Sequence, residues 1–429
     1  MTDKISVREA AYLCLLRCES GNKFSNIELD HAIEKYGFAG YDRGFFTTLV
    51  YGVIERRITL DHVISCYSKT PLHKMENKVL HILRLGAYQI LFLDRTPDSA
   101  ACNESVELAK KHTHKGTAGF VNGVLRNIAR NKNSYPMPDG ADEYLSVKYS
   151  CPVWLIQLWE EQYGKNKAEK ILQAINVFPK LTLRVNTLKT SREEFLLSLN
   201  EEKISAEKTE ISEDGVVLND YVPISDIKSI QLGLCYVQDE ASQICVDTLD
   251  AKRGQTVIDT CSCPGGKSFG IAMKMLNEGV IYSFDLHESK LSLIDKGASR
   301  LGITIIRTEA HNGASPKAEL IGKADRVLCD VPCSGLGVIA KKPDLRHKSI
   351  SDIKRLPEIQ YGILKASSEY VKNGGYIVYS TCTLNKDENE NVVSKFISEN
   401  DGFCIEEMKT FFPDEGKNDG FFVCKIKKK

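Results

Sequence analysis

The sequence has no hydrophobic run long enough to cross a membrane. A membrane helix needs about 20 mainly apolar residues, and no stretch of the 429 residues meets that requirement. The opening segment MTDKISVREA also lacks the apolar centre of a secretory signal. We therefore expect a cytoplasmic protein that does not contact membranes.

Neither charge sign is in excess, because 57 Lys and Arg residues balance 57 Asp and Glu residues. The chain is 42% hydrophobic and 27% charged, so it can bury real cores, which excludes wholesale disorder. At about 100–200 residues per domain, its length indicates two or three domains. The 14 cysteines are scattered along the chain, and we expect buried or catalytic thiols rather than a disulfide framework.

The first part of the chain has helical periodicity throughout. Ser6 and Glu9 have the spacing of a capping box. Apolar residues recur with helical spacing in four segments: Phe45–Ile58, Lys78–Leu93, Ala100–Lys111 and Phe120–Ala129. These patterns predict an all-helical domain over residues 1–137, ending in a Pro-containing and Gly-containing linker at 131–141.

The pattern changes twice more along the chain. An alternating stretch at Leu181–Thr187 predicts a strand, and Ser191–Leu199 predicts a helix, so residues 138–235 are interpreted as a linker with a small α+β subdomain. Short apolar strands then alternate with helices over residues 236–429, which predicts an α/β domain with a mostly parallel sheet and helices on both faces. The predicted strands are Thr256–Asp259, Val280–Asp285, Thr304–Arg307, Arg326–Asp330 and Tyr376–Tyr379.

A glycine-containing loop follows the first of these strands. In α/β domains of this kind, ligands bind at the carboxyl ends of the strands, so this loop is a candidate binding site. Its residues are Cys261, Ser262, Cys263, Pro264, Gly265, Gly266 and Lys267. The two glycines allow close backbone approach, and the next helix offers unpaired N–H groups. A P-loop is disfavoured, since Cys261 stands where that motif needs glycine.

Two polar positions after the next strands complete a predicted cofactor site. Asp285 ends the second strand and can accept the hydroxyl hydrogens of a ribose, although a helix cap is the alternative interpretation. Asn312, in His311-Asn312-Gly313, can accept from an adenine amino group, with Glu309 as the other candidate and a simple turn as the competing interpretation. Together these residues predict a cofactor that contains adenosine.

Thiols follow the fourth and fifth strands, in the motifs DVPCSG (Cys333) and STCT (Cys382). A zinc site is disfavoured because the cysteine spacings are not those of common zinc knuckles, and we expect no metal. A thiolate that adds to C6 of cytosine makes C5 nucleophilic toward S-adenosylmethionine, and a nearby acid assists by neutralising the charge that develops. Spacing alone does not say which cysteine attacks.

At these motifs the chain resembles the RNA cytosine-C5 methyltransferases of the NOL1/NOP2/Sun group. The matching stretches are CSCPGGK (261–267), DRVLCDVPCSGLG (325–337), STC (380–382) with ENE (388–390), and DGFF (419–422). The resemblance implies a Rossmann-like class I methyltransferase domain with a seven-stranded sheet. Residues 1–133 separately resemble the helical RNA-binding domain of the antitermination factor NusB, in stretches such as DRGFFTTLVYGVIE (42–55).

The resemblance also implies roles. Cys382 corresponds to the nucleophile, Cys333 to the thiol that aids release, and Asp330 to a residue that contacts the target base and the cofactor. Lys267 corresponds to a cofactor-site position close to the base, and we expect its charge to lower the pKa of a nearby thiol. Residues 341–348, with the pair Lys341-Lys342, are interpreted as a segment that contacts RNA phosphates, with a solvated loop as the alternative interpretation.

The implied substrate is 16S ribosomal RNA before full assembly of the small subunit, modified by a monomer. Two alternatives stay open at this point. The same chemistry could act on transfer RNA, or the chain could be a non-catalytic RNA-binding or assembly protein. The helical front domain argues against the first alternative, and the two cysteines argue against the second.

Overall fold

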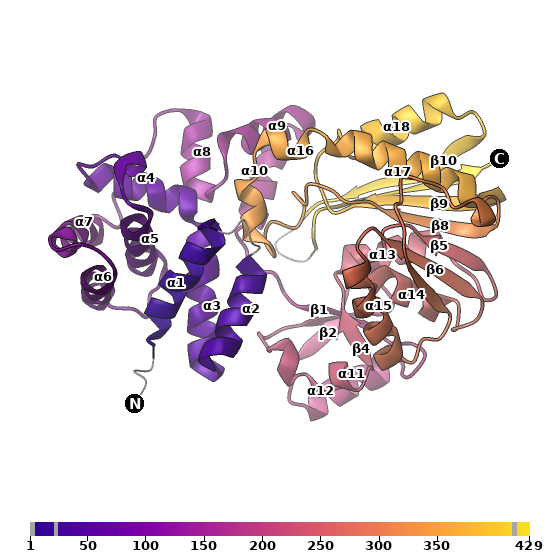
Figure 1. Cartoon of the computed structure of the whole chain (residues 1–429), viewed down its shortest axis with the longest axis horizontal. Helices are drawn as coiled ribbons and strands as arrows, with labels where there is room; N and C mark the ends of the chain where they lie inside the picture. Colours follow the sequence, from indigo (N-terminus) through magenta and orange to yellow (C-terminus); the bar gives the residue numbers. More distant parts are fainter. Residues whose placement is uncertain (1–4, 21–24, 414–417) are drawn as a thin grey trace. The chain divides into compact units, whose positions relative to one another are not determined.

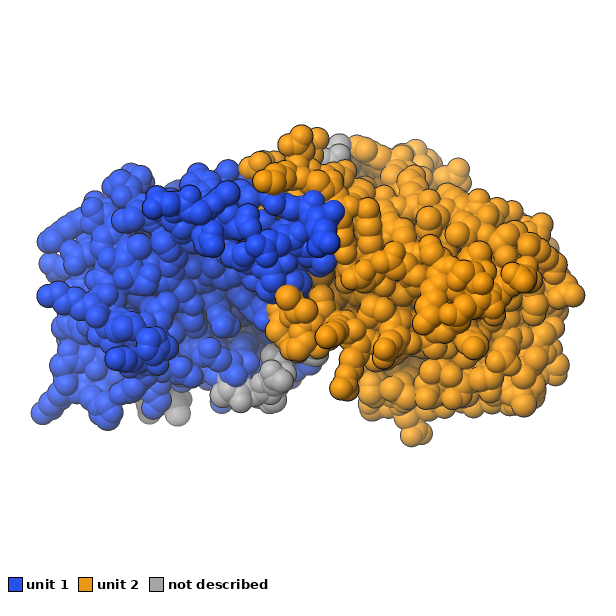
Figure 2. Space-filling view, turned by 90° about the horizontal axis from the view of Figure 1, so that it is seen from above, with its two compact units in different colours: residues 1–161, 342–347 blue, residues 162–341, 348–429 orange. Residues whose placement is uncertain are grey.

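The structure is a computed structural model that describes residues 5–20, 25–413 and 418–429. The chain divides into two compact units, which Figure 2 colours separately: unit 1 contains residues 1–161 and 342–347, and unit 2 contains 162–341 and 348–429. The division at residues 137 and 235 therefore stays a prediction. In the described ranges, no helix is both long and apolar enough to cross a membrane.

Unit 1 is helical, which confirms the prediction for the front of the chain. Its α-helices are α1 (Val7–Ser20), α2 (Ser25–Tyr36), α3 (Gly40–Glu55), α4 (Arg57–Tyr67), α5 (Asn77–Phe92), α6 (Asp98–His112), α7 (Thr117–Arg130), α8 (Ala141–Tyr149) and most of α9 (Val153–Tyr163), with the short η1 (Leu72–Lys74) and η4 (Pro343–His347). One hydrophobic cluster spanning Ala10 to Ile128 forms the core.

Two details of this domain differ from the expected pattern. The predicted helix Phe45–Ile58 is wrong as one element, because α3 ends at Glu55 and α4 begins at Arg57. The capping box at α1 is only half formed: Ser6 Oγ accepts from the Glu9 N–H at 3.1 Å. The Glu9 carboxylate instead bonds Lys111 and His112 on α6, both at 2.9 Å, and so fastens α1 to α6.

The segment 342–347 belongs to unit 1, although its neighbours in sequence belong to unit 2. Arg346 is fully buried, and its Nη1 donates to the carbonyls of Glu55 at 2.9 Å and Ser150 at 3.1 Å. His347 contacts the carbonyl of Ile54 at 2.8 Å. The expectation that residues 341–348 contact RNA phosphates is therefore wrong for Arg346, since its guanidinium already satisfies buried carbonyls.

Unit 2 begins with a small sheet in the order β2-β3-β1-β4, with every pair antiparallel. Its strands are β1 (Thr182–Val185), β2 (Ala206–Lys208), β3 (Gly215–Leu218) and β4 (Cys235–Val237), and its helices are α10 (Lys165–Ala174), α11 (Arg192–Glu201) and α12 (Lys228–Gln231), with the short η2 (Ile224–Asp226). A complete capping box between Ser191 and Glu194 starts α11, as the predicted helix requires.

The second sheet of unit 2 has seven strands in the order β10-β11-β9-β8-β5-β6-β7 (Figure 1). The strands are β5 (Thr256–Asp259), β6 (Val280–Asp285), β7 (Ile306–Ala310), β8 (Ala324–Asp330), β9 (Val371–Thr381), β10 (Phe403–Phe411) and β11 (Phe421–Lys428). The helices are α13 (Glu240–Leu249), α14 (Gly266–Lys274), α15 (Glu288–Leu301), α16 (Ile350–Ile353), α17 (Leu356–Tyr370) and α18 (Glu390–Glu399), with the short η3 (Ala318–Leu320).

Adjacent strand residues point to opposite faces of this sheet, and each face has its own core. Val257 and Leu328 belong to a cluster with α13, α14 and α15, whereas Ile258 and Val327 belong to a cluster with α17 and α18. Figure 1 shows these two groups of helices on opposite sides of the sheet. The strands from β5 through β9 are all parallel. Strands β11 and β10 extend the sheet beyond β9 as an antiparallel edge, which the sequence pattern did not predict.

A buried ionic network fastens the small sheet to α13. Arg184 on β1 is 0% exposed, and its Nη2 lies 2.9 Å from Asp214 and 3.2 Å from Asp247 of α13. Lys274 shares both carboxylates, at 2.9 and 3.1 Å. Arg184 therefore packs the subdomain against the catalytic domain.

Replacing Arg184 tests this network. We expect Arg184→Met to lower the free energy of unfolding by about 3 kcal/mol, because it leaves two carboxylates with only Lys274 as cation. Arg253→Met is the matched control: Arg253 is 63% exposed in its pair with Glu278, and its loss should cost much less, because solvent screens the pair. Urea unfolding measures both, and equal losses would contradict a special role for Arg184.

Candidate functional site

The predicted cofactor loop lies between the ends of two neighbouring strands. Ser262, in the loop after β5, donates to the carbonyl of Phe284 at the end of β6 from both its N–H (2.8 Å) and its Oγ (2.9 Å). The carboxylate of Asp285 accepts from the N–H groups of Cys263 at 3.3 Å and His287 at 3.0 Å. The structure thus brings the loop and Asp285 together, as predicted.

Two glycines lie in the loops at the carboxyl ends of the strands, where an added Cβ would crowd neighbouring atoms. Gly265 has a φ of +108°, and a Cβ there would lie 2.5 Å from the ring of Phe269. Gly313, in the loop after β7, lies so close to the loop after β5 that a Cβ would stand 3.2 Å from the carbonyl oxygen of Thr260. Larger residues at these positions would displace the backbone that lines the predicted cofactor site.

The two candidates for the adenine contact have different surroundings. Glu309 forms an ion pair with Lys317 at 2.5 Å. Asn312 is exposed, and its Oδ1 accepts from the Ala314 N–H at 3.1 Å, which is the turn geometry weighed as the alternative. Glu309 is therefore committed to an ion pair, whereas the role of Asn312 stays a prediction.

Two thiols meet at the carboxyl ends of β8 and β9. Sγ of Cys333 lies 3.2 Å from Sγ of Cys382, although 49 residues separate them in the sequence. The Gly337 N–H donates to the carbonyl of Cys382 at 3.0 Å and fixes the turn that carries this cysteine. None of the 14 cysteines forms a disulfide, as the sequence predicts.

An ion pair lies at the same edge of the sheet. Nζ of Lys267 lies 2.6 Å from Oδ2 of Asp330, whose Oδ1 accepts from Ser380 Oγ at 2.8 Å. Although burial lowers the pKa of Lys267, the carboxylate of Asp330 outweighs it and raises that pKa above its usual value. Lys267 also interacts electrostatically with Cys382, so a permanent positive charge faces this thiol.

The expected lowering of a thiol pKa by Lys267 is wrong for Cys333. The hydrogen bond with Cys382, together with burial, raises the pKa of the Cys333 thiol well above its usual value. A thiol that holds its proton suits proton transfer rather than nucleophilic attack.

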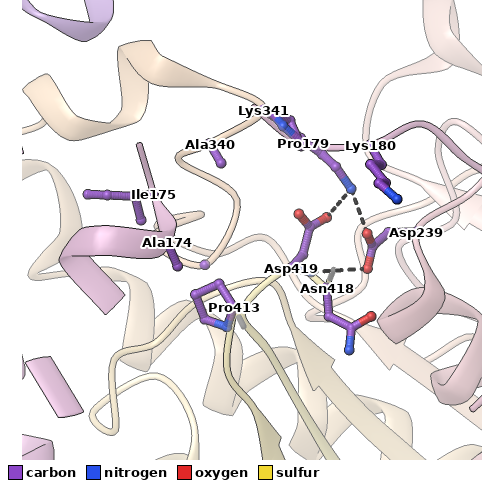
Figure 3. Close-up of a pocket in the computed structure, with 11 residues that line it drawn as sticks. Ala174, Ile175, Pro179, Lys180, Asp239, Ala340, Lys341, Pro413, Asn418 and Asp419 are labelled. Atoms are coloured by element: carbon purple, nitrogen blue, oxygen red, sulfur yellow. Dashed lines mark hydrogen bonds and ion pairs between the residues drawn. The ribbon is translucent and has the colours of Figure 1, made fainter. Parts of the chain in front are cut away.

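A pocket lies beside the turn that follows Cys333 (Figure 3). Ala174, Ile175, Pro179, Lys180, Asp239, Gly337, Ala340, Lys341, Pro413, Asn418 and Asp419 line it. Lys341 lies 2.5 Å from Asp239 and 2.8 Å from Asp419, and burial followed by the Asp239 carboxylate raises the pKa of Asp419 to about 7. Lys341 is therefore paired with two carboxylates of the protein, and its contact with RNA phosphates stays a prediction. Sequence spacing gave no signal for this cluster, because its members come from three distant segments.

Asp239 helps hold Lys341. Gly420, which follows Asp419, donates from its N–H to the carbonyl of Gly337 at 2.8 Å. The cluster therefore supports the loop that bonds the Cys382 carbonyl. Among the described residues, no three side chains of metal-binding type gather into a candidate metal site.

Comparison with known proteins agrees with this architecture. The family model "16S rRNA methyltransferase RsmB/F" matches residues 246–427, the NusB family model matches 5–130, and the ferredoxin-like domain of RsmF/B-like methyltransferases matches 151–225. A probable ribosomal RNA small subunit methyltransferase B of Bacillus subtilis is 39% identical over 99% of both chains. The chain belongs to the 16S rRNA methyltransferase RsmB/F family. A Synechocystis protein of the same description is 35% identical over 99% of this chain and 100% of its own length.

Solved structures resemble this RsmB/F-family chain over different extents. The crystal structure of PH0851 has a TM-score of 0.84 and 25% identity, and covers 99% of both chains. A methyltransferase homolog from Pyrococcus horikoshii has a TM-score of 0.58 and 26% identity over 66% of this chain and 98% of its own. The predicted three-part fold, with a NusB-like domain, an α+β subdomain and a Rossmann-like sheet, is confirmed.

One buried acid at this edge was not predicted as a site residue. Asp259, the last residue of β5, is 0% exposed and accepts from Ser268 Oγ at 2.7 Å. Burial raises its pKa to about 7, so the carboxyl is largely protonated below neutral pH. A protonated acid between the cofactor loop and the base of α14 makes the stability of this edge depend on pH.

Asp259→Asn should remove that dependence. In the wild type, Asp259 stays protonated in the folded chain between pH 4 and pH 7 while the unfolded chain releases the proton. Its contribution to the free energy of unfolding therefore falls as pH rises, by up to about 1.4 kcal/mol per pH unit, and levels off above about pH 7. Urea unfolding measured from pH 5 to pH 8 should show that the free energy of unfolding falls less steeply with pH in Asp259→Asn than in the wild type. The exposed control Asp226→Asn should keep the wild-type dependence of the free energy of unfolding on pH. A shallower dependence in this control as well would contradict the assignment of the effect to Asp259.

Proposed function

We propose that this chain transfers a methyl group from S-adenosylmethionine to C5 of a cytosine in 16S ribosomal RNA through a covalent bond between Cys382 and C6. The observation that carries the proposal is the pair of thiols 3.2 Å apart beside the Lys267–Asp330 ion pair. An acyl or phosphoryl transferase has no use for two adjacent thiols, whereas addition and elimination at a pyrimidine use one for each half of the cycle.

The edge formed by β5, β6 and β7 would hold the cofactor. The residues assigned to it are Cys261, Ser262, Cys263, Pro264, Gly265, Gly266, Lys267, Asp285, Asn312 and Asp330. Each carboxylate oxygen of Asp285 accepts one backbone N–H, which leaves lone pairs for ribose hydroxyls. S-adenosylmethionine would supply an electrophilic methyl group here. A Cβ at Gly265 would meet the ring of Phe269, and a Cβ at Gly313 would meet the Thr260 carbonyl, so both glycines preserve the backbone path of this edge.

The attack step follows from the charges around Cys382. Its sulfur, as a thiolate, forms a bond to C6, and the electron pair of the C5–C6 double bond moves into the ring and makes C5 nucleophilic. Lys267 lies where its positive charge stabilises both the thiolate and the negative charge that develops on the base. Asp330, held by Ser380 and Lys267, would orient the base through its amino edge.

The release step uses the second thiol. The proton on C5 leaves, its electron pair re-forms the C5–C6 double bond, and the bond from C6 to Sγ of Cys382 breaks with its electrons going to sulfur. Because the two sulfur atoms lie 3.2 Å apart, Cys333 can give its proton to the departing sulfur and take up the C5 proton. Cys333 then ends the step protonated, as it began. Cys382 is left as a thiol and loses that proton to solvent before the next attack.

The two thiols should fail differently when replaced. Cys382→Ala should form no adduct and transfer no methyl group, since no sulfur can reach C6. Cys333→Ala should still attack but release slowly, so a protein–RNA adduct that resists denaturant accumulates. A denaturing gel with labelled RNA separates these outcomes. The reverse pattern would exchange the two roles, and full transfer by Cys382→Ala would disprove the adduct.

The RNA substrate is proposed from the relatives, which are described as small-subunit ribosomal RNA methyltransferases. Bisulfite sequencing of ribosomal RNA from cells lacking the protein should show one cytosine that is no longer methylated, and the purified protein should restore it. Restoration only in transfer RNA would favour the alternative substrate. No change in either RNA would favour a non-catalytic assembly protein.

A further inference from the structure

Glu388 is a fully buried carboxylate in the turn between β9 and α18, within the ENE motif that the proposed chemistry did not use. Its Oε2 accepts from the Ser334 N–H at 2.8 Å and from Gln360 Nε2 at 2.9 Å. Its Oε1 accepts from Asn385 Nδ2 at 3.1 Å. Three N–H groups therefore satisfy a carboxylate that is removed from water.

These contacts hold the backbone on both sides of Cys333. Ser334 is the residue after the thiol, and Glu388 binds it directly. Pro332 is the residue before the thiol, and its carbonyl accepts from Gln360 Nε2 at 3.0 Å, so Gln360 connects it to the same carboxylate. The loop that carries Cys333 is thus fixed at two points around one buried charge.

The same network reaches the turn that carries Cys382. Ser334 Oγ and Thr383 Oγ1 lie 2.6 Å apart, and Thr383 is the residue after Cys382. Asn389, next to Glu388, donates from Nδ2 to the Thr383 carbonyl at 2.9 Å and accepts from Thr381 Oγ1 at 2.5 Å. Cys382 directly follows β9, and Gly337 bonds its carbonyl. The Cys333 loop is held by Glu388 through the Ser334 N–H and by Lys348 Nζ, which donates to the Ser334 carbonyl at 2.8 Å.

Hydrogen bonds to a charged acceptor are about twice as strong as neutral ones, and a buried N–H that loses its partner is costly. Removing the carboxylate would leave the Ser334 N–H without its acceptor, and Gln360 Nε2 would keep only the Pro332 carbonyl. The loop would then relax by shifting the thiol, and a displacement of about 1 Å can slow a proton transfer by roughly a hundredfold.

We propose that Glu388 is a positioning residue that holds the Cys333 thiol against Cys382 for the release step. The inference rests on the proposed function, because it gives Cys333 the role of the releasing thiol. Glu388 itself touches neither the sulfur atoms nor the base; it acts through the backbone of Ser334 and Pro332.

The test is the fate of the covalent adduct in Glu388→Ala. We expect attack to proceed and release to slow by roughly 10–100-fold, so that the variant accumulates a denaturant-resistant adduct as Cys333→Ala does. A purely structural role would lower adduct formation and product formation together. Adding Cys333→Ala to Glu388→Ala should change release little further, since both act on one step. Asp387→Asn, which removes an exposed acidic charge one residue away, should release at the wild-type rate.

Each outcome decides one claim. Absence of adduct in Cys333→Ala would overturn the proposed release role and this inference with it. The inference alone would be overturned if Cys333→Ala accumulates the adduct but a folded Glu388→Ala either releases at the wild-type rate or no longer attacks. The proposed release role of Cys333 would then still stand. If thermal unfolding shows that Glu388→Ala is not folded, Glu388→Gln decides. It keeps an oxygen for Ser334 but turns an amide N–H toward Asn385. More adduct than in the wild type supports positioning, and wild-type release overturns it.

Discussion

The site depends on the parallel pairing of β8 with β9. Their register sets Asp330 opposite Ser380, so both strands end at the same level of the sheet and the turns that follow them begin side by side. Cys333 and Cys382 come three and two residues later, which is why their sulfur atoms meet despite the sequence between them. The hydrogen bond from Ser380 to Asp330 joins the same two strand ends. A slip of one residue would turn these side chains to opposite faces.

Polar groups at this edge are arranged so that few charges stay uncompensated. Lys267 faces Asp330, Lys341 faces two carboxylates, and Glu388 is enclosed by N–H donors. Such pairing is what allows ionic groups to persist where water is largely excluded. The groups are therefore oriented before any substrate arrives, and the proposed reaction would need little reorganisation as charge develops on the base.

Much of this arrangement could be predicted from the sequence. Strands β5 and β6 have the predicted bounds, and the residues after β5, β6, β8 and β9 gather at one edge because parallel strands share their carboxyl ends. The pattern failed where partners are remote: Lys341 joins Asp239 and Asp419, and Arg184 joins Asp214 and Asp247, through contacts that no local spacing encodes. The edge strands β10 and β11 were missed as well. Charges such as Arg346 were interpreted as surface groups, because burial of a cation depends on carbonyls contributed by other segments.

The placement of residues 342–347 makes the helical domain a composite of two stretches of chain. A fragment that ends near residue 161 would lack Arg346, and the carbonyls of Glu55 and Ser150 would lose the guanidinium that satisfies them. Residues 342–347, which come late in the sequence, therefore complete the helical unit, and exchanging that unit between relatives would require exchanging this short segment with it.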